Sequence, residues 1–271
     1  MATITASMVN ELRAKTGQGM MECKKALTEV GGDVEKAIEY FRKKGVKTSV
    51  TERQATEGRV AVSLAPDNRA GAIAEVLCNT DFTAKSEVVA KLLNDAACRG
   101  AANPGADVRN DPALRDATTS ISQQTGENVQ LSRVVTLAAP AGGKVGGFHY
   151  TVTGKIGVLV ALTGNPSDDV IRNLCLHIVA NKPLAMTRDQ IPADVVAKER
   201  EIAIEQAKAT GKPQQIAEKI AEGKLNAFFA ERSLLDQEFV RPDVFKGTVA
   251  AYLKQGGATL VKYERVEVGQ Q

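Results

Sequence analysis

The stretch RVAVSLAPDNRAGAIAEVLCNT, residues 59–80, decides the fold class of this chain. Two strand-like runs stand on either side of Pro66-Asp67-Asn68, which is a sequence typical of a tight turn. The second run ends in an apolar segment, residues 74–78, that is typical of a buried strand. The stretch therefore predicts a β-hairpin, and its neighbours show what covers that hairpin.

A helix is predicted directly after the hairpin, over SEVVAKLLNDAACRG, residues 86–100. We expect one side of it to carry Val88, Val89, Leu92 and Leu93, and we expect it to end at Gly100. Residues 105–125 read as a polar excursion with one short helix, and residues 129–137 as a third strand. Strands backed by a helix on one side indicate an α+β unit.

The same plan occurs a second time, in GFHYTVTGKIGVLVALTGNPSDDVIRNLCLHIVANKP, residues 147–183. This segment has a strand, a turn, an apolar strand over 156–162 and a helix, and a last strand is predicted near residues 258–268. We therefore expect an α+β protein with two homologous sheet-plus-helix subdomains, residues 51–140 and 141–271. An antiparallel helical hairpin is inserted in the second, at about 195–235, with its reversal at Gly211-Lys212-Pro213.

Residues 1–50 predict a separate bundle of three short helices. Thr5 or Ser7 can cap the first helix, and Gly31-Gly32 ends the second. Asp33 can cap the third helix, whose apolar residues repeat at i, i+3, i+4 and i+7. A bundle of this size barely sustains its own core, so we expect it to serve for contact with another molecule.

Composition limits the function classes. The chain has 271 residues, 43% hydrophobic residues and a net charge of +3, with basic and acidic residues interspersed. Such a weak charge excess, with 4% aromatic residues and no Trp, argues against direct binding of nucleic acid. No signal-like or membrane-spanning stretch is recognised, and the four cysteines lack metal-site spacing. We expect a cytoplasmic protein without membrane contact, with buried reduced thiols.

Residues able to make or break bonds are scarce. The two histidines, His149 and His177, lie in a predicted strand and an apolar helix, and neither accompanies a nucleophile. No phosphate-binding glycine loop and no metal-ligand cluster is present in the sequence. We therefore predict no catalytic residue, no bound cofactor and no metal, and interpret the chain as a binding protein rather than an enzyme.

Phe82 is the residue that most needs an explanation. It follows the buried strand at a strand-to-helix junction, where a large apolar ring has little to pack against. One interpretation is that the ring folds back onto the core beneath it. The other is that it contacts another protein, and the second copy favours this, since it has Gly164-Asn165-Pro166 at that place and no aromatic residue.

Four segments together resemble the bacterial elongation factor Ts family. They are LRAKTGQGMMECKKALTEVGGDVEKAIEYFRKKG, NTDFTAK, GENVQLSRV and LHIVANKP, and their order and spacing agree over nearly the whole chain. The excursion at residues 105–125 follows the family pattern only loosely. The chain stops at VEVGQQ, so the additional C-terminal helical module of some members is expected to be absent.

The resemblance implies a guanine-nucleotide exchange factor for the GTPase elongation factor Tu, in its GDP-bound and nucleotide-free states. It implies that the turn of Thr80, Asp81, Phe82 and Thr83 intrudes beside the magnesium site of that GTPase, with the Phe82 ring in an apolar gap. Asp81 has two open interpretations: it disturbs the magnesium ligands, or it only caps the following helix.

The resemblance also implies the docking surfaces. The N-terminal bundle, implied to be ubiquitin-associated-like, would dock through Arg13, Met20 and Met21, although one methionine can equally fill the bundle core. His177, Asn181, Lys182 and Pro183 would contact a second domain of the GTPase, whereas His177 from its own pattern is a core-edge residue. The helical hairpin can contact the partner or mediate self-association.

Two other functions are compatible with parts of this sequence. A non-catalytic chaperone or scaffold would hold a GTPase without exchanging its nucleotide, and such a protein would tolerate the substitution Phe82→Ala. Peptide binding of the ubiquitin type by the bundle alone leaves two thirds of the chain unexplained. The effect of Phe82→Ala therefore distinguishes a nucleotide exchange factor from a scaffold.

Overall fold

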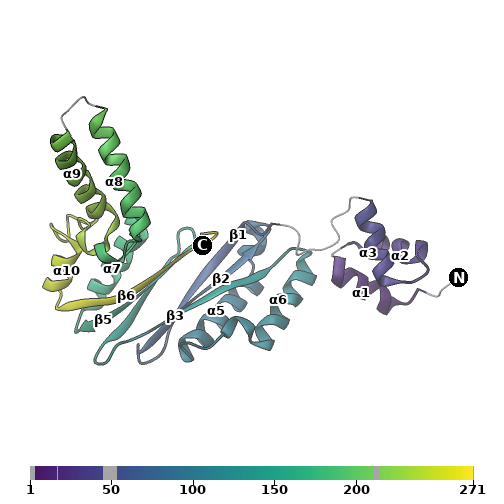
Figure 1. The fold of residues 1–271 in the computed structure, drawn as a ribbon. Coiled ribbons are helices and arrows are strands. Elements are labelled where there is room, and N and C mark those ends of the chain that lie inside the picture. Colours follow the sequence, from purple (N-terminus) through teal and green to yellow (C-terminus); the bar gives the residue numbers. More distant parts are fainter. Residues whose placement is uncertain (1–3, 17, 45–53, 210–213, 271) are drawn as a thin grey trace.

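The computed structural model describes residues 4–16, 18–44, 54–209 and 214–270. Its centre consists of two three-stranded antiparallel sheets with helices on their outer faces (Figure 1). A helical bundle lies at one end of the molecule and a helical hairpin projects from the other end. The predicted α+β class, with a three-helix bundle and a helical hairpin, is confirmed.

The first sheet has the strand order β1-β2-β3 and forms from the hairpin predicted at residues 59–80. Its strands are β1 (Glu57–Leu64), β2 (Ala70–Cys78) and β3 (Gln130–Ala138). The helices of this half are α4 (Asp81–Ala84), α5 (Glu87–Ala102) and α6 (Pro112–Thr125), with a 3-10 turn at Val108–Asn110. The helix α5 continues past Gly100 to Ala102, and α6 is longer than the short helix predicted, at 14 residues. Val88 was wrongly placed on the buried side of α5, since its side chain is exposed.

The second sheet has the matching order β4-β5-β6. Its strands are β4 (Lys144–Tyr150), β5 (Ile156–Gly164) and β6 (Ala258–Glu267). The helices that cover it are α7 (Asp168–Asn181) and α10 (Val249–Gln255), and 3-10 turns lie at Arg188–Gln190 and Leu234–Asp236. The helix α10 was not predicted; it precedes β6 as α6 precedes β3. The predicted repeat therefore extends further than the sequence pattern indicated.

The two sheets repeat each other down to their irregularities. In the first sheet the pairing of β2 with β3 shifts between Glu75 and Val76, and in the second the pairing of β5 with β6 shifts between Ala161 and Leu162. A β-bulge of this kind bends its strand at a defined position. Because both bulges occur at the same point of the central strand, residues of the two halves can be matched one by one.

The sheets pack against each other through a shared apolar cluster. Ile73 of β2 and Leu159 of β5 are fully buried in it, together with side chains from β1, β3, β4 and β6. At Gly157 a Cβ atom would lie 2.9 Å from the Ile73 side chain, so glycine lets the sheets approach closely. The opposite faces of the sheets pack against α5 and α7, in two further clusters.

The N-terminal bundle consists of α1 (Ala6–Thr16), α2 (Met20–Glu29) and α3 (Val34–Lys43) around Leu12, Leu27 and Phe41. Thr5 Oγ1 accepts a hydrogen bond from the Met8 amide at 3.3 Å, and Asp33 caps α3 by accepting from the Lys36 amide at 3.1 Å. These caps agree with the predicted helix starts.

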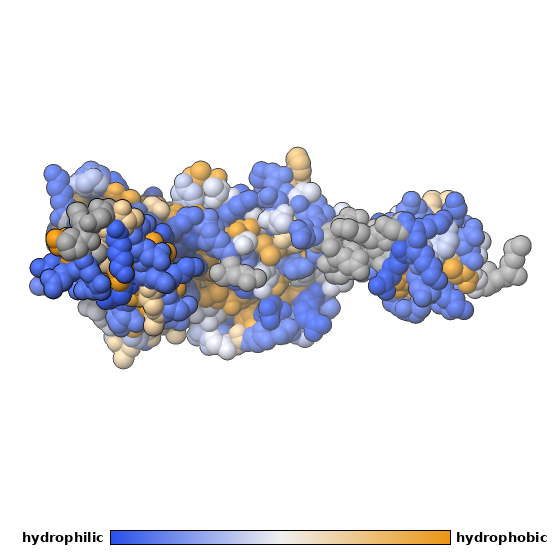
Figure 2. All heavy atoms as spheres, turned by 45° about the horizontal axis from the view of Figure 1, so that its top comes forward, coloured by the Kyte–Doolittle hydropathy of each residue, from blue (hydrophilic) through white to orange (hydrophobic). Residues whose placement is uncertain are grey.

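The helical hairpin, called the arm below, consists of α8 (Ala193–Lys208) and α9 (Gln214–Arg232). Ala203 and Ala207 of α8 and Leu225 of α9 are buried, whereas Ile202 and Ile216 of the same two helices are exposed. The predicted reversal at Gly211-Lys212-Pro213 lies outside the described residues. Figure 2 shows more apolar atoms over the core than over the largely hydrophilic arm and bundle.

Three of the four cysteines, Cys23, Cys78 and Cys175, are buried and unpaired, as predicted, whereas Cys98 is exposed. Burial raises the pKa of Cys78 to about 11 and that of Cys175 to about 12, so both thiols are protonated at neutral pH. Across the described part of the chain, no helix is long and apolar enough to cross a bilayer.

Candidate functional site: the Phe82 turn

The Phe82 turn, residues 79–85, follows β2 and contains the short helix α4. Phe82 is 83% exposed, more than any other large apolar side chain among the described residues. The interpretation that its ring folds back onto the core is therefore wrong. The next two residues, Thr83 and Ala84, are buried instead, so the turn is fixed to the core while its aromatic ring faces solvent.

The turn is rigid because hydrogen bonds at both ends close it. Thr80 caps α4, accepting from the Thr83 amide at 3.3 Å. Ser86 caps the next helix, α5, and its hydroxyl donates to the Thr83 carbonyl at 2.7 Å. Two helix caps six residues apart in the chain leave little freedom for the segment between them.

Glu127 supports the turn from beneath. It lies in the loop between α6 and β3, and its carboxylate accepts from the amides of Asn79 and Thr80 at 3.1 and 3.0 Å. It also accepts from the Thr80 hydroxyl at 2.7 Å. Burial would raise the pKa of Glu127, but these hydrogen bonds outweigh it and lower the pKa below the usual value of glutamate. The carboxylate is therefore ionised at neutral pH and fixes the position of the turn.

The Asn79 side chain links the same turn to two neighbouring segments. Its amide group donates to the Gln54 carbonyl at 2.8 Å, and its side-chain oxygen accepts from the Asn128 amide at 2.8 Å. Neither Asn79 nor Glu127 was predicted as a site residue, because a contact between residues 48 positions apart leaves no local pattern in the sequence. The only signal was that both residues lie inside the segments NTDFTAK and GENVQLSRV, which carry the family resemblance.

Asp81 is not the helix cap that one interpretation made of it. Thr80 has that role, and the exposed Asp81 carboxylate lies 2.7 Å from the Lys85 ammonium group, one helical turn further on. The hydrogen bond from Lys85 lowers the pKa of Asp81. The turn therefore presents to solvent an apolar ring beside a carboxylate.

His177 of α7, a predicted docking residue, is fully buried. The Val240 amide donates to its Nδ1 at 3.1 Å, so the proton lies on Nε2, which faces the Gln237 side-chain oxygen at 2.9 Å. Burial lowers the pKa of His177, and the ring stacks on Phe239. In this conformation His177 positions its surroundings and is not available for direct contact with a partner.

The predicted contact residues that follow His177 differ in exposure: Lys182 is exposed, Asn181 is half-buried and Pro183 is buried. Asn181 approaches His177 Nε2 to 3.4 Å, and Lys182 ends the helix with a left-handed φ of 44°. The Lys182 ammonium group lies 3.1 Å from the Glu267 carboxylate, and the Pro183 carbonyl accepts from the Tyr263 hydroxyl at 3.0 Å. These contacts attach the helix end to β6.

The Phe82 turn and the end of α7 lie at the same end of the core. Cys78, just before the turn, pairs with Glu57 of β1, which forms a 2.7 Å ion pair with Lys155. The next residue, Ile156, pairs with Glu267, which holds Lys182. The structure thus brings together two of the three predicted contact segments.

The third predicted contact segment lies on the bundle. Met20 is 55% and Met21 74% exposed, and Arg13 is exposed as well. At least one methionine was predicted to be available for contact, and both are. Flexible thioether side chains at the start of α2 suit an adaptable protein contact.

Nothing in the described residues forms a metal site, because no three His, Cys, Asp or Glu side chains come close enough to hold an ion. His149, the other histidine considered, lies on β4, and burial lowers its pKa. The arrangement at the Phe82 turn offers contact surface and a charge, and no pair of groups arranged for proton transfer or nucleophilic attack.

Comparison with known proteins gives a consistent result. The model of the family described as "Elongation factor TS" matches residues 79–270. The chain is 39% identical to elongation factor Ts of Methylococcus capsulatus over 279 residues, covering 99% of this chain and 93% of the relative. It is 40% identical to that of Thioalkalivibrio sulfidiphilus, covering 99% and 93% of the two chains, and 38% identical to that of Nautilia profundicola, covering 100% and 94%. A match of this length and identity, together with the fold, shows that the chain belongs to the elongation factor Ts family.

Proposed function

We propose that this translation elongation factor is a guanine-nucleotide exchange factor for elongation factor Tu, which promotes release of GDP by disturbing the magnesium site. The observation that carries the proposal is Phe82, 83% exposed on a turn whose backbone is held from behind by Glu127. An apolar ring so exposed and so firmly positioned has no purpose within the chain itself.

The Phe82 ring can supply a useful part of the exchange energy. Transfer of one phenylalanine side chain from water to an apolar site contributes about 1.5–3 kcal/mol. If that energy is fully coupled to nucleotide release, it weakens nucleotide binding by about ten- to a hundredfold. Because the turn is already rigid, little of this energy is lost in ordering the loop upon binding.

Magnesium is a suitable target for such an intrusion. Mg²⁺ requires near-ideal octahedral geometry, so small displacements of its ligands weaken its binding and that of the nucleotide phosphates it bridges. The Phe82 ring would separate elements of the partner beside the ion. The Asp81 carboxylate, exposed beside the ring, would disturb the ligands or their water shell.

Docking requires further surface than one ring. We assign Arg13, Met20 and Met21 on the bundle to one contact, and Asn181 and Lys182 to a second contact with another domain of the GTPase. Pro183 is buried and supports the second contact through its carbonyl, which accepts from Tyr263. His177 contributes to the second contact indirectly, by fixing the end of α7 and the segment around Val240. The arm provides a further surface, either for the partner or for self-association.

The nucleotide cycle follows from linkage. If this protein weakens binding of GDP to its partner, GDP weakens binding of this protein by the same factor. The complex is therefore most stable with nucleotide-free elongation factor Tu, and either nucleotide dissociates it. No bond is made or broken in this scheme, so the protein is not an enzyme, and the role assigns it to the cytoplasm without direct contact to nucleic acid.

The test is release of a fluorescent GDP analogue from elongation factor Tu, measured against the concentration of this protein. Wild type accelerates release strongly, and Phe82→Ala lowers the maximal rate by about ten- to a hundredfold. The matched control is Val261→Ala, which trims an exposed apolar side chain on β6 that belongs to none of the proposed contacts. Both variants should keep the wild-type melting temperature, because neither side chain is buried.

Two outcomes contradict the proposal. Binding of elongation factor Tu without any acceleration by wild type would favour the chaperone or scaffold function. Acceleration that survives Phe82→Ala would keep the exchange function and assign its cause to the docking surfaces.

A further inference from the structure

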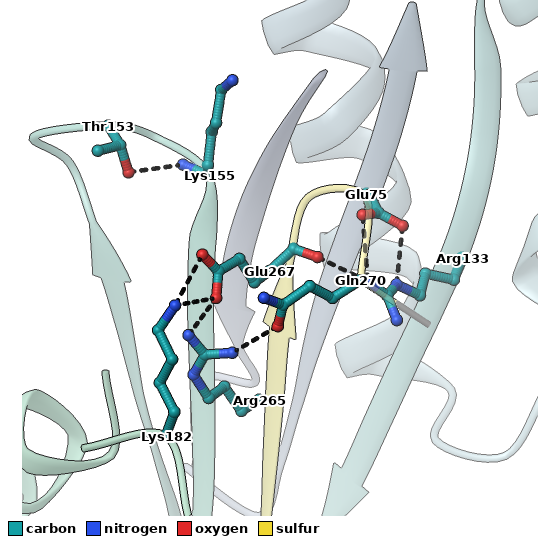
Figure 3. Close-up of polar contacts among 8 residues, drawn as sticks. All are labelled: Glu75, Arg133, Thr153, Lys155, Lys182, Arg265, Glu267 and Gln270. Atoms are coloured by element: carbon teal, nitrogen blue, oxygen red, sulfur yellow. Dashed lines mark hydrogen bonds and ion pairs between the residues drawn. The ribbon is translucent and has the colours of Figure 1, made fainter. Parts of the chain in front are cut away.

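A buried ion pair joins β2, which leads into the Phe82 turn, to its neighbour β3. Glu75 of β2 is only 2% exposed, and its carboxylate is held bidentately by Arg133 of β3, at 2.7 Å from Nε and 3.2 Å from Nη2 (Figure 3). The pair lies opposite the second sheet, on the face that carries Ile73. Removing a carboxylate from water costs several kcal/mol, which even good pairing often only offsets.

The repeated fold does not need this pair. The bulges place Glu75 opposite Arg133 in the first sheet and Ala161 opposite Lys262 at the matching position of the second sheet. The second half forms the same strand order with the same bulge without a buried carboxylate there. The ion pair therefore has a purpose specific to the first half.

The pair also reaches across to the second sheet. Arg133 Nη2 donates to the Glu267 carbonyl of β6 at 2.9 Å, and the Gly269 amide donates to Glu75 Oε1 at 3.3 Å. Apolar contacts between the sheets resist separation but have no direction, so they do little against sliding. Hydrogen bonds to charged groups are directional and strong, so they fix the lateral position of the sheets.

Each end of this set of contacts leads to a proposed contact surface. On one side, β2 runs from Glu75 into the Phe82 turn, and β3 follows the loop that carries Glu127. On the other side, the Glu267 carboxylate binds Lys182 at the end of α7, and Arg265 binds both Glu267 and Gln270, as Figure 3 shows. The strand β2 and these polar contacts together thus connect the Phe82 turn with the end of α7.

We propose that Glu75, Arg133, Glu267 and Gly269 form an inter-sheet clamp that fixes the Phe82 turn relative to the end of α7, so that both engage the partner as one rigid body. The four are positioning residues, acting through the turn and through Lys182. The role in exchange rests on the proposed function, whereas the fixed geometry does not.

The geometry is tested without a partner. Spin labels are attached at Glu87→Cys, the first residue of α5, and at Ala180→Cys in the last turn of α7, in a Cys98→Ser background. Both label sites are exposed and lie outside the proposed contacts. The clamp variant is Glu75→Leu with Arg133→Met, which removes both charges together and leaves no orphan ion in the core. We expect one narrow distance distribution with the clamp intact and a broadened or shifted one in the variant, at a similar melting temperature.

A second variant breaks fewer contacts. A chain that ends at Val268 loses the hydrogen bond that the Gly269 amide donates to Glu75 and the one that Arg265 donates to Gln270, and it keeps the ion pair itself. It keeps the fold even if the double substitution does not, and it should broaden the distance distribution to a smaller extent.

Exchange is then measured with unlabelled proteins. The clamp variant should lower the maximal rate of GDP release by about tenfold, within the range expected for residues of one network, while the half-saturating concentration changes by less than about threefold. A purely structural role would lower the melting temperature and the amount of active protein without this separation. Truncation at Val268 should have a smaller effect in the same direction.

The outcomes separate the two proposals. An unchanged distance distribution in both variants overturns the clamp, and so does a changed distribution with the full exchange rate. A changed distribution with no acceleration of GDP release by wild type overturns the proposed function and leaves the positioning role supported. A changed distribution with the expected loss of rate supports both.

Discussion

The two halves share strand order and bulge position, yet they close the loop after the central strand with different hydrogen-bond acceptors. In the first half the Asn79 amide donates to the Glu127 carboxylate at 3.1 Å. In the second half the matching residue, Asn165, donates to the backbone carbonyl of Gly257 at 3.3 Å. Both acceptors lie in the loop between the last helix and the last strand of their half. The same connection can therefore be closed by a side chain or by the backbone itself.

The two loops also differ in length and in how closely they pack against neighbouring backbone. A Cβ atom at Gly164 would lie 2.1 Å from the Gly257 carbonyl oxygen, so the second loop lies directly on its neighbour. In the first half Cys78 occupies that position, and the segment before the next helix cap is longer. Residues 79–85 precede Ser86, whereas only Asn165 and Pro166 precede Ser167, and the additional residues include α4, which carries Phe82 outward. One substituted acceptor thus accompanies the difference between a packed loop and a contact loop.

The largest expected effect comes from breaking the packed loop. Gly164 has a φ of 86°, a left-handed conformation that alanine adopts only with strain, and the added Cβ would meet backbone. We expect Gly164→Ala to lower the free energy of unfolding by about 3 kcal/mol or more, measured by urea denaturation. Cys78→Ala, at the matching position, should cost only about 1 kcal/mol. A loss below about 1 kcal/mol for Gly164→Ala would show that the second loop is not tightly packed.

The second-largest effect is expected from removing Glu127, the side-chain acceptor of the loop after β2. Glu127→Ala leaves the amides of Asn79 and Thr80 without their acceptor, which should lower the free energy of unfolding by about 1–3 kcal/mol. Because the Phe82 turn then loses its support, we expect the maximal rate of GDP release to fall by about tenfold. Asp116→Ala, which removes an exposed carboxylate on α6 that belongs to none of the proposed contacts, is the control and should change neither quantity. Full exchange activity in folded Glu127→Ala would mean that the turn is rigid without Glu127.

Much of the fold was predictable from the sequence because its signals are local. The hairpin around Pro66-Asp67-Asn68, the caps of the bundle and the two helices of the arm follow from turn residues and apolar periodicity. The helix α10 was missed because it has only seven residues, too few for a clear period. The face-to-face packing of the sheets was not predicted either, since it depends on contacts between residues far apart in the chain.

The residues of the candidate site were likewise predictable only where their signal is local in the sequence. Phe82 was identified from its position alone, because an aromatic ring at a surface junction conflicts with its surroundings. Glu127 and Gln237 were not, because their partners lie 48 and 60 residues away. Glu75 gave a signal that was not used: one acidic residue stands inside the apolar run AGAIAEVLC, and a buried carboxylate requires a partner.

Low pH should reduce the stability that the loop after β2 contributes and leave the contribution of the loop after β5 unchanged. The folded pKa of Glu127 is lowered, so its stabilising contribution is present above the ordinary pKa of glutamate and is lost as the pH falls through the lowered folded value. The difference in unfolding free energy between wild type and Glu127→Ala should therefore be constant near pH 7 and shrink below about pH 4.5. The Gly257 carbonyl does not titrate, so the loss caused by Gly164→Ala should not follow this pH dependence. A constant difference for Glu127→Ala down to pH 3 would contradict the assignment of Glu127 as an ionised acceptor.

The smallest expected effect concerns Asp81. Its ion pair with Lys85 is exposed, and such pairs contribute about 0–1 kcal/mol, so Asp81→Asn should shift the melting temperature by no more than a few degrees. Its effect on exchange separates the ring from the carboxylate, because the substitution keeps the size of the side chain and removes only its charge. If the carboxylate acts at the magnesium site, Asp81→Asn lowers the maximal rate of GDP release by about threefold at low magnesium concentration, less than Phe82→Ala does. If the rate stays at the wild-type value across a magnesium titration, the exposed ring alone distinguishes the first loop from the second.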